Sequence, residues 1–383
     1  MTLLEKLHNL GNPRRNLNYL SYLCRSIETR STTILTGFLI IFVITTITEM
    51  ILLVGDGEHA SVAHLNLSPR SDTFSATSLH SKATLQPPRL KPTSGSWQKV
   101  WGTREKFFVF SAYYEAREAE KKLRIIAVAK LDNTDDVWCR MWSVSGSHVA
   151  TERAQLQAIR EHWNLTYSAF YVFCPLNGIE TVPHSVSLVN NPYRLIPCTN
   201  RLFVHNNLKK GNNKPNDITM AICVKPLHHY YDNTMVLLQF LEYYQLLGVS
   251  HVLLYNDTSS AATSCLLKDY ERRGVVSVLP WQRLDVGSQT EIRTGGMLAA
   301  LNDCLHRTTH RFTHVAMLDF DELIVPRHHH TLQDLLRWID PSPEKSKIGS
   351  YVIQNAFFYL QWPDGVKGIS SRKDCWPYRK HVA

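Results

Sequence analysis

The regular alternation of strand-like and helix-like segments over residues 218–318 is the feature that most constrains the fold. Short apolar runs are separated by longer segments whose apolar residues recur at helical spacing, and two of these segments stop at Gly248 and Gly274. We predict strands at residues 218–224, 251–255, 275–280 and 314–318, and helices at 235–247, 264–273 and 289–307. This alternation predicts a parallel sheet with right-handed crossovers, and therefore an α/β fold.

Polar residues follow three of the predicted strands. Lys225 follows the first strand, Asn256 and Asp257 the second, and Asp319 and Asp321 the last. Because ligands of open α/β sheets bind beyond the carboxyl ends of the strands, we expect one cleft to collect these side chains. No glycine-rich phosphate loop follows the first strand, so we expect a metal to hold any phosphate group.

Asp319 and Asp321 form the predicted metal site. The uncharged residues 314–318 before them predict a buried strand, and on an extended backbone the two carboxylates would emerge on the same side. Two carboxylates suit a hard divalent cation that also binds diphosphate oxygens. The neighbouring Glu322 either joins the metal shell or pairs with Arg327.

Three adjacent histidines, residues 328–330, are predicted to lie in a solvated turn. Adjacent residues on a regular element cannot all face one ion, which argues against a metal site there. Thr331 is expected to cap a helix over residues 332–339, and Asp334 to support its first turn.

The N-terminal segment predicts a membrane anchor. Residues 31–48 carry no charge, and apart from Glu49 the apolar character continues to Val54, which is long enough for a helix across a bilayer. The excess of basic residues in 1–30 predicts a cytosolic tail, a span at 31–54 and a lumenal remainder. A buried helix of a soluble domain is the alternative. Residues 55–98, rich in Ser, Thr and Pro, predict an extended stem.

Residues 99–210 predict a β-rich accessory domain in which no group of residues suggests chemistry. The expected strands are residues 107–114, 123–130, 137–144 and 170–174, with a helix at 151–162.

The charge and the cysteine content indicate the cellular compartment of the chain and the class of partner it binds. The formal net charge of +9 is spread along the chain without a long basic run, which argues against nucleic-acid binding. Seven of the eight cysteines follow the predicted span, so in an oxidising lumen several should pair and at least one should stay free or pair between chains. Glycosylation sequons begin at Asn66, Asn164 and Asn256, as expected of a secretory glycoprotein.

Six ordered motifs stand out in this sequence: Cys223–Leu227, Leu241–Val249, Leu254–Asp257, Gly274–Val276, Ala300–Leu305 and Leu318–Glu322. Together they resemble the motifs of the family-92 glycosyltransferases. Phe110–Tyr114 also resembles the family's N-terminal portion, so the resemblance covers roughly residues 107–360. It implies a GT-A-like fold in a type II Golgi membrane protein. It also implies inverting transfer of galactose from UDP-galactose, with Mn²⁺, to a glycan acceptor.

The resemblance implies roles for individual residues. Asp319 and Asp321 match the metal and diphosphate motif of the family. Lys225, Asn256 and Asp257 match positions near the nucleotide. A solvated strand end for Lys225 and a simple turn for Asn256-Asp257 remain open as alternatives.

Asn302 and Asp303 lie on the predicted helix before the metal strand. The resemblance implies that they face the donor sugar, and capping or local pairing is the alternative.

The sequence departs from the family at its C-terminal end. Family members continue beyond the position of Ala383, in a region expected to hold a general base and a further metal ligand. We predict a strand at residues 351–359, and beyond it Asp364 and Asp374 are typical of exposed turns. The GT-A-like domain, residues 211–383, is therefore predicted to be incomplete.

Two other functions remain open. A non-catalytic lumenal protein that binds a nucleotide sugar or a glycan is consistent with a missing base. An aspartate-nucleophile phosphohydrolase would use Asp319 and Asp321 differently, but Leu323 stands where that motif has Thr or Val.

Overall fold

The computed structural model describes residues 90–116, 120–132, 135–193, 198–206, 218–286, 291–341 and 348–357. The predicted cytosolic tail and membrane span, residues 1–30 and 31–54, lie outside these ranges together with most of the predicted stem. Within the described ranges, no helix has both the length and the apolar character needed to cross a bilayer. The chain divides into two compact units, Met1–Leu336 and Arg337–Ala383.

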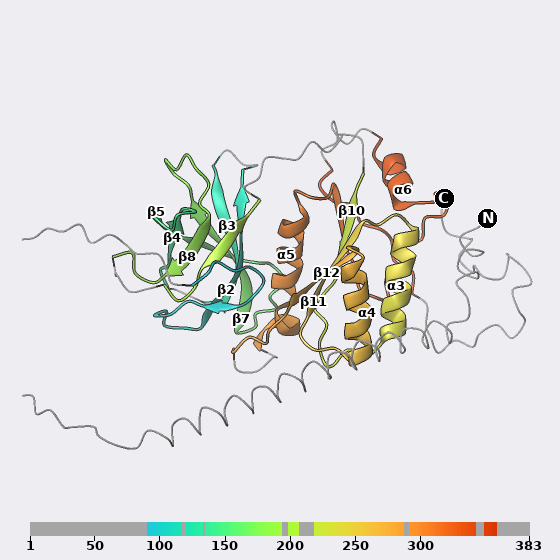
Figure 1. Cartoon of the computed structure of the whole chain (residues 1–383), viewed down its shortest axis with the longest axis horizontal. Coiled ribbons are helices and arrows are strands. Elements are labelled where there is room, and N and C mark those ends of the chain that lie inside the picture. Colours follow the sequence, from blue (N-terminus) through green and yellow to red (C-terminus); the bar gives the residue numbers. More distant parts are fainter. Residues whose placement is uncertain are drawn as a thin grey trace, which may run out of the picture. The chain divides into compact units, whose positions relative to one another are not determined.

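A large, mainly antiparallel sheet forms the first part of unit one (Figure 1). Its strands lie in the order β5-β4-β8-β9-β2-β3-β7-β6, and β1 pairs with β2. Their bounds are Gln98–Lys99 for β1, Phe107–Glu115 for β2, Lys122–Lys130 for β3, Trp138–Trp142 for β4, His148–Arg153 for β5, Gln155–Ala158 for β6, Tyr167–Pro175 for β7, Ser185–Val189 for β8 and Leu202–His205 for β9. The predicted β-rich segment is thus present, and all four of its predicted strands are confirmed.

The helix predicted at residues 151–162 is wrong. This segment completes β5, which pairs with β4, and then forms β6, which pairs with β7, both antiparallel. Along β6 the exposed Gln155 and Gln157 alternate with the half-buried Leu156 and Ala158, which is the period of a strand. The backbone groups at the edge of β7 satisfy those of β6, and this long-range pairing outweighs the local helical pattern.

A separate four-stranded sheet confirms the predicted parallel α/β arrangement. Its order is β12-β11-β10-β13, and all neighbouring strands are parallel. The bounds are Met220–Cys223 for β10, His251–Asn256 for β11, Val276–Pro280 for β12 and His314–Met317 for β13. The helices are Thr234–Leu246 for α3, Ala261–Arg272 for α4, Met297–Thr308 for α5 and Leu332–Ile339 for α6. Gly248 and Gly274 follow α3 and α4 with φ of +85° and +74°, a conformation that favours glycine at a helix end.

Two details of this sheet differ from the prediction. The strand before the aspartates is not buried, because β13 lies at the sheet edge, where its residues are half-buried and Met317 is 45% exposed. Helix α5 begins at Met297, later than predicted, because Thr294, Gly295 and Gly296 all have positive φ and interrupt the helix.

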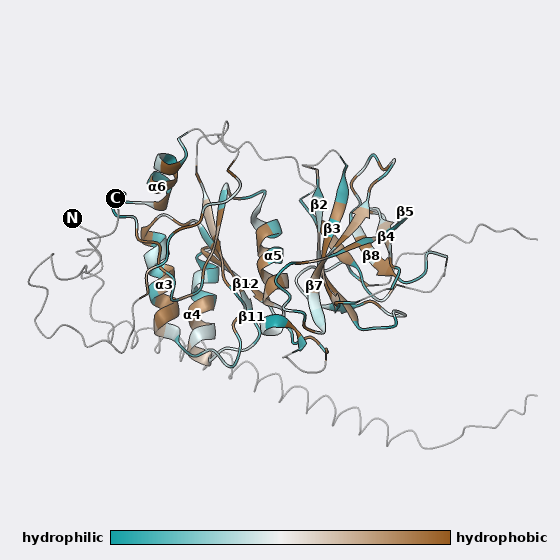
Figure 2. Ribbon diagram, turned by 180° about the vertical axis from the view of Figure 1, so that it is seen from behind, coloured by the Kyte–Doolittle hydropathy of each residue, from teal (hydrophilic) through white to brown (hydrophobic). Residues whose placement is uncertain are grey.

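Helices cover both faces of the parallel sheet. Apolar residues of α3 and α4 pack on one face in a single core cluster with β10 and β11. Helix α5 covers the other face, and a second cluster joins it to β2 and β3, so α5 lies between the two sheets (Figure 1). Figure 2 shows hydrophobic residues alternating with hydrophilic ones along these helices, as expected of helices with buried faces.

Disulfides reinforce both parts of unit one. Cys139 pairs with Cys174 inside the β-rich sheet, and Cys223 at the end of β10 pairs with Cys304 of α5. Among the described cysteines Cys198 is a free, buried thiol.

In unit two, residues 351–357 are not in a strand, so the strand predicted at 351–359 is wrong over these positions. Here the Tyr351 hydroxyl donates a hydrogen bond to Asp340 over 3.0 Å. Asp364 and Asp374 lie outside the described residues.

Candidate active site

Two loops at the carboxyl ends of the parallel strands are joined by backbone hydrogen bonds. The loop after β10 contacts the loop after β11 where Leu227 N donates to Tyr255 O over 2.8 Å and Asp257 N donates to Leu227 O over 3.0 Å. Farther along, Tyr231 N donates to Thr258 O over 3.1 Å. The side chains of both loops are therefore held in fixed positions relative to each other.

Lys225 and Asp319 lie side by side because of the strand register. Cys223 of β10 is paired with Met317 of β13, and each of the two polar residues lies two positions beyond its paired residue. The Lys225 Nζ is 2.6 Å from Asp319 Oδ2, with side-chain exposures of 45% and 37%. The parallel register thus brings together two residues that are 94 positions apart in the sequence.

The two aspartates lie on a turn, and the expectation of an extended backbone is wrong at this point. The Glu322 N donates to Asp319 O over 3.1 Å, and the Glu322 carboxylate accepts from Asp319 N over 2.9 Å. Phe320 packs between them against Tyr231 and Phe240, with ring centroids 5.5 and 5.2 Å apart. This anchored turn presents Asp321 at the surface, and within it the Glu322 carboxylate contacts the backbone of Asp319.

The charge of Asp321 acts on the loop after β10. Burial, and then the negative charges of Asp232 and Asp321, raise the pKa of the Tyr231 hydroxyl above its ordinary value. Asp321 therefore lies near this loop. The turn, and not the alternation of side chains along a strand, sets the position of its carboxylate relative to that of Asp319.

His228 is a site residue that the sequence analysis missed. Its Nδ1 is 3.3 Å from Asp257 Oδ2, and both side chains are largely buried, with exposures of 19% and 14%. The His228 Nε2 and the Asn256 Oδ1 are buried atoms that have no hydrogen-bond partner in the described part of the chain. Buried polar atoms are rarely left unpaired, so each of these atoms is a candidate to bond a water or a ligand. The available signal was the position of His228 in the loop directly after Lys225.

Two of the predicted glycosylation sites, Asn256 and Asn164, differ in their suitability as glycan acceptors. The Asn256 Nδ2 donates to Ser259 Oγ over 3.0 Å and the residue is half-buried, so it is a poor glycan acceptor. Asn164 is exposed in a turn, as an acceptor requires.

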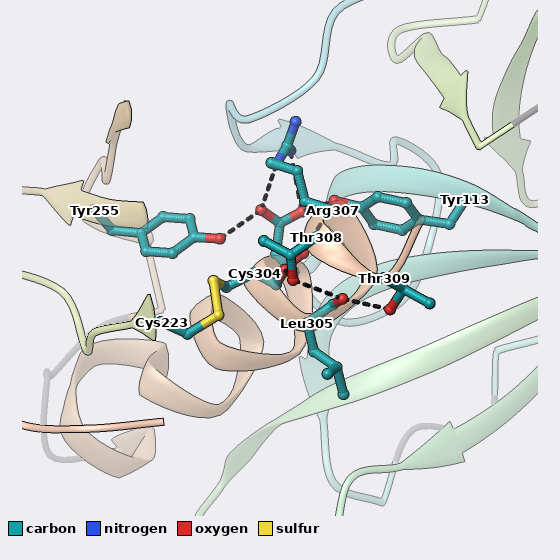
Figure 3. Close-up of a disulfide and its surroundings, with 9 residues drawn as sticks. Tyr113, Cys223, Tyr255, Cys304, Leu305, Arg307, Thr308 and Thr309 are labelled. Atoms are coloured by element: carbon teal, nitrogen blue, oxygen red, sulfur yellow. Dashed lines mark hydrogen bonds and ion pairs between the residues drawn. A yellow bond between two sulfur atoms is a disulfide. The ribbon is translucent and has the colours of Figure 1, made fainter. Parts of the chain in front are cut away.

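Asp303 is fully buried in a polar network between the two sheets. Its carboxylate accepts from the hydroxyls of Ser111, Tyr113 and Tyr255, and it pairs with Arg307, whose Nε is 3.1 Å from Oδ2. Figure 3 shows the hydroxyls of Tyr113 and Tyr255 pointing toward α5 from opposite sides. Burial raises the Asp303 pKa, but the charge of Arg307 and the hydrogen bonds outweigh it, and the net pKa lies below the ordinary value.

Asn302 is occupied by similar contacts. Its Oδ1 accepts from the Tyr171 hydroxyl and its Nδ2 donates to Leu298 O over 2.7 Å. These contacts connect α5 to β7 and to its own preceding turn. The donor-facing role of Asn302 and Asp303 stays a prediction, and the strand-end residues gather without either of them.

The residues present fit a partial metal shell. In the described part of the chain, no three His, Cys, Asp or Glu side chains are grouped closely enough to hold an ion by themselves. Small divalent cations that assist phosphate chemistry are commonly held by one or two carboxylates, with phosphate and water supplying the other ligands. Asp319 and Asp321 fit that arrangement. The three histidines at 328–330 lie in a bend before α6, as expected of a turn.

Comparison with known proteins is informative for the second half of the chain. Residues 218–375 match the family model described as Glycosyltransferase family 92. A curated relative, "Glycosyltransferase family 92 protein F13G3.3" of Caenorhabditis elegans, is 29% identical over 116 residues, which cover 28% of this chain and 23% of the relative. The match thus spans about a quarter of the length of this relative. The strand-end residues described above all lie inside 218–375.

Proposed function

This chain belongs to glycosyltransferase family 92 through residues 218–375, and we propose on that premise that it transfers galactose from UDP-galactose to a glycan acceptor, with inversion and with Mn²⁺. Membership supports sugar transfer from a donor to an acceptor. The identity of the sugar, the metal and the stereochemistry are proposed from the resemblance of the sequence motifs to family 92, and the residues of the site are consistent with a bound diphosphate.

The observation that carries the proposal is the ion pair of Lys225 and Asp319 at the carboxyl ends of the parallel strands β10 and β13. A cation and a carboxylate 2.6 Å apart, beside the exposed Asp321, supply both kinds of group that a diphosphate needs. Lys225 offers a direct contact to phosphate oxygens, and the two carboxylates offer oxygen ligands for a cation. When bound, Mn²⁺ would neutralise charge on the leaving UDP.

The neighbouring loops suit the nucleoside part of the donor. Asn256, Asp257 and His228 lie on the hydrogen-bonded loops beside Lys225, and two of their buried polar atoms have no partner among the described residues. Atoms of this kind can bond a polar ligand edge without first losing another partner.

We assign no catalytic base to the described residues. Deprotonation of an acceptor hydroxyl requires a carboxylate or imidazole within hydrogen-bond reach of it. Asp303 does not qualify, because it is fully buried and both of its oxygens are engaged. The Glu322 carboxylate is engaged by the backbone of Asp319.

A second candidate is a lumenal protein that binds a nucleotide sugar or a glycan without turnover, for which the Lys225–Asp319 pair would serve binding alone. The two candidates differ in one measurement. A catalytic protein releases UDP in proportion to a glycosylated product, whereas a binding protein is only stabilised by the donor.

We further propose a type II topology in the Golgi membrane with the described residues in the lumen. The disulfides Cys139–Cys174 and Cys223–Cys304 support an oxidising compartment. Protease added to sealed microsomes should spare the chain beyond about residue 56, and cleavage there without detergent would refute this orientation.

The decisive experiment uses the full chain purified in detergent. UDP release from UDP-galactose, with a glycan acceptor and with Mn²⁺ or EDTA, should require the metal. Asp319→Asn combined with Asp321→Asn should abolish turnover and also the thermal stabilisation by Mn²⁺ and UDP. The control Asp136→Asn removes an exposed carboxylate paired with Arg153 in the β-rich sheet and should change neither. An unchanged stabilisation in the double variant would remove the aspartates from the site. Stabilisation without turnover would support the non-catalytic candidate.

A further inference from the structure

An open pocket of about 530 Å³ lies on the β-rich sheet, outside the region that matches the family. Residues of three adjacent strands line it: Lys122, Arg124, Gln155, Leu156, Gln157, Tyr171 and Phe173. No carboxylate is among these lining residues, whereas two cations are.

The strand register places the polar and aromatic lining residues on one face. Arg124 of β3 is paired with Phe173 of β7, which is paired in turn with Gln155 of β6. Two residues before Phe173 on the same strand, Tyr171 is paired with Gln157 of β6. Because alternate residues of a strand share a face, these side chains form a continuous patch across three strands.

Arg124 is held rigidly in this patch with an unused donor. Its guanidinium lies 4.6 Å from the Tyr171 ring centroid and 5.0 Å from that of Phe173. The side chain is only 13% exposed, and its contact with Glu115 is long, at 3.8 Å. The Arg124 Nε is buried without a hydrogen-bond partner in the described structure. The guanidinium therefore has hydrogen-bonding capacity that its described neighbours do not use.

The second cation extends the positive patch. The Lys122 Nζ lies 4.8 Å from the Phe173 ring centroid, on the same strand as Arg124. An arginine fork binds the paired oxygens of a carboxylate or sulfate, and a nearby ammonium adds a second charge contact. The exposed amides of Gln155 and Gln157 can each both donate to and accept from hydroxyl groups.

We propose that this pocket binds an acidic saccharide, a sugar that carries a carboxylate or sulfate group. The anion contacts Arg124 and Lys122, and the hydroxyl groups contact the glutamine amides of β6. The choice of a saccharide as carrier of the anion rests on the proposed function in glycan modification. The anion site itself rests only on the geometry of the pocket.

The test is ligand-observed NMR with the full chain in detergent, titrated with 3′-sialyllactose and, separately, with lactose. We expect 3′-sialyllactose to bind with an affinity that falls as salt rises, and lactose to bind at least about tenfold more weakly. Lys122→Gln and Gln157→Ala should each weaken 3′-sialyllactose binding by roughly three- to tenfold, the range of one polar contact. The matched control Lys130→Gln changes the last residue of β3, which pairs with Glu105 over 3.3 Å, and should have no effect.

Several results would overturn the proposal. Equal affinity for the two sugars would show that no charge is recognised, and equal effects of Lys130→Gln and Lys122→Gln would place the binding elsewhere. Displacement of 3′-sialyllactose by an equal concentration of sodium sulfate would show that the pocket binds anions without recognising the sugar. The assay needs no sugar transfer, and the Asp319→Asn and Asp321→Asn double variant should bind 3′-sialyllactose normally. Failure of the proposed transferase activity and failure of this site are therefore distinguishable.

Discussion

Lys225 and Asp319 form a 2.6 Å ion pair because each lies two residues beyond a paired position of neighbouring parallel strands. The pair is more than a third exposed, so its contribution to folding stability is small, at most about 1 kcal/mol. Because folding depends little on this charge pair, both groups remain available to contact a charged ligand at the ends of the strands.

Lys225→Met should therefore separate function from stability. We expect UDP release to fall on the order of 10²-fold, because one preorganised charge contact to the leaving group is lost. The melting temperature should change little. Steady-state kinetics and thermal unfolding check both parts, and Lys268→Met on α4 is the control. Normal turnover in Lys225→Met would exclude Lys225 from the donor site.

Asp303→Asn should destabilise the protein strongly. The change leaves Arg307, whose side chain is 14% exposed, without its buried carboxylate, and removing one partner of a buried pair typically costs about 3–5 kcal/mol. Denaturant unfolding measures the loss. Asp269→Asn, which removes a partly exposed carboxylate 3.0 Å from Arg272, should cost less than about 1 kcal/mol. Similar losses in both variants would contradict the assignment of Asp303 as the polar link between the sheets.

The free energy of unfolding should decrease as the pH falls from about 6.5 toward 4. Burial, and then the positive charge of Arg307, lower the pKa of His205 to about 4, and Asp303 opposes this shift only in part. Between the two pKa values the unfolded chain binds a proton that the folded chain does not, so this stability is complete above about pH 6.5 and is lost as pH falls through the folded pKa. His205→Gln should flatten the dependence of the melting temperature on pH in this window. The exposed His229→Gln should not, and an unchanged slope in His205→Gln would refute the prediction.

Removing the Cys223–Cys304 disulfide should cost more stability than removing Cys139–Cys174. The two disulfides close loops of 81 and 35 residues, and the longer loop constrains the unfolded chain more, by about 0.7 kcal/mol in the loop-entropy account. Cys223 also lies two residues before Lys225, so Cys223→Ala with Cys304→Ala should weaken UDP binding as well. Thermal unfolding and UDP titration of the two double variants test this order. The reverse order in stability would mean that native packing, not loop length, dominates.

The amino-acid sequence by itself determined the elements of the parallel sheet and the polar residues at their ends. Apolar periodicity, together with Gly248 and Gly274, is local information, and it predicted β10 to β13 and the helices between them within a few residues, except for the start of α5, which was predicted at residue 289 and lies at Met297. The motifs that identify the family are local in the same sense. Lys225, Asn256, Asp257, Asp319 and Asp321 could be placed at one sheet edge because parallel strands present their carboxyl ends together.

Only the tertiary structure decided which partner each of these residues has. The segment 151–162 became strands because β4 and β7, which lie outside it on either side in the sequence, offered backbone groups for pairing. Asp303 became a buried link because β2 and β11 bring Tyr113 and Tyr255 to opposite sides of α5. The unpaired atom of Arg124 likewise depends on a register between strands. Such pairings involve residues distant in sequence, and their free energy depends on burial and register that no local pattern encodes.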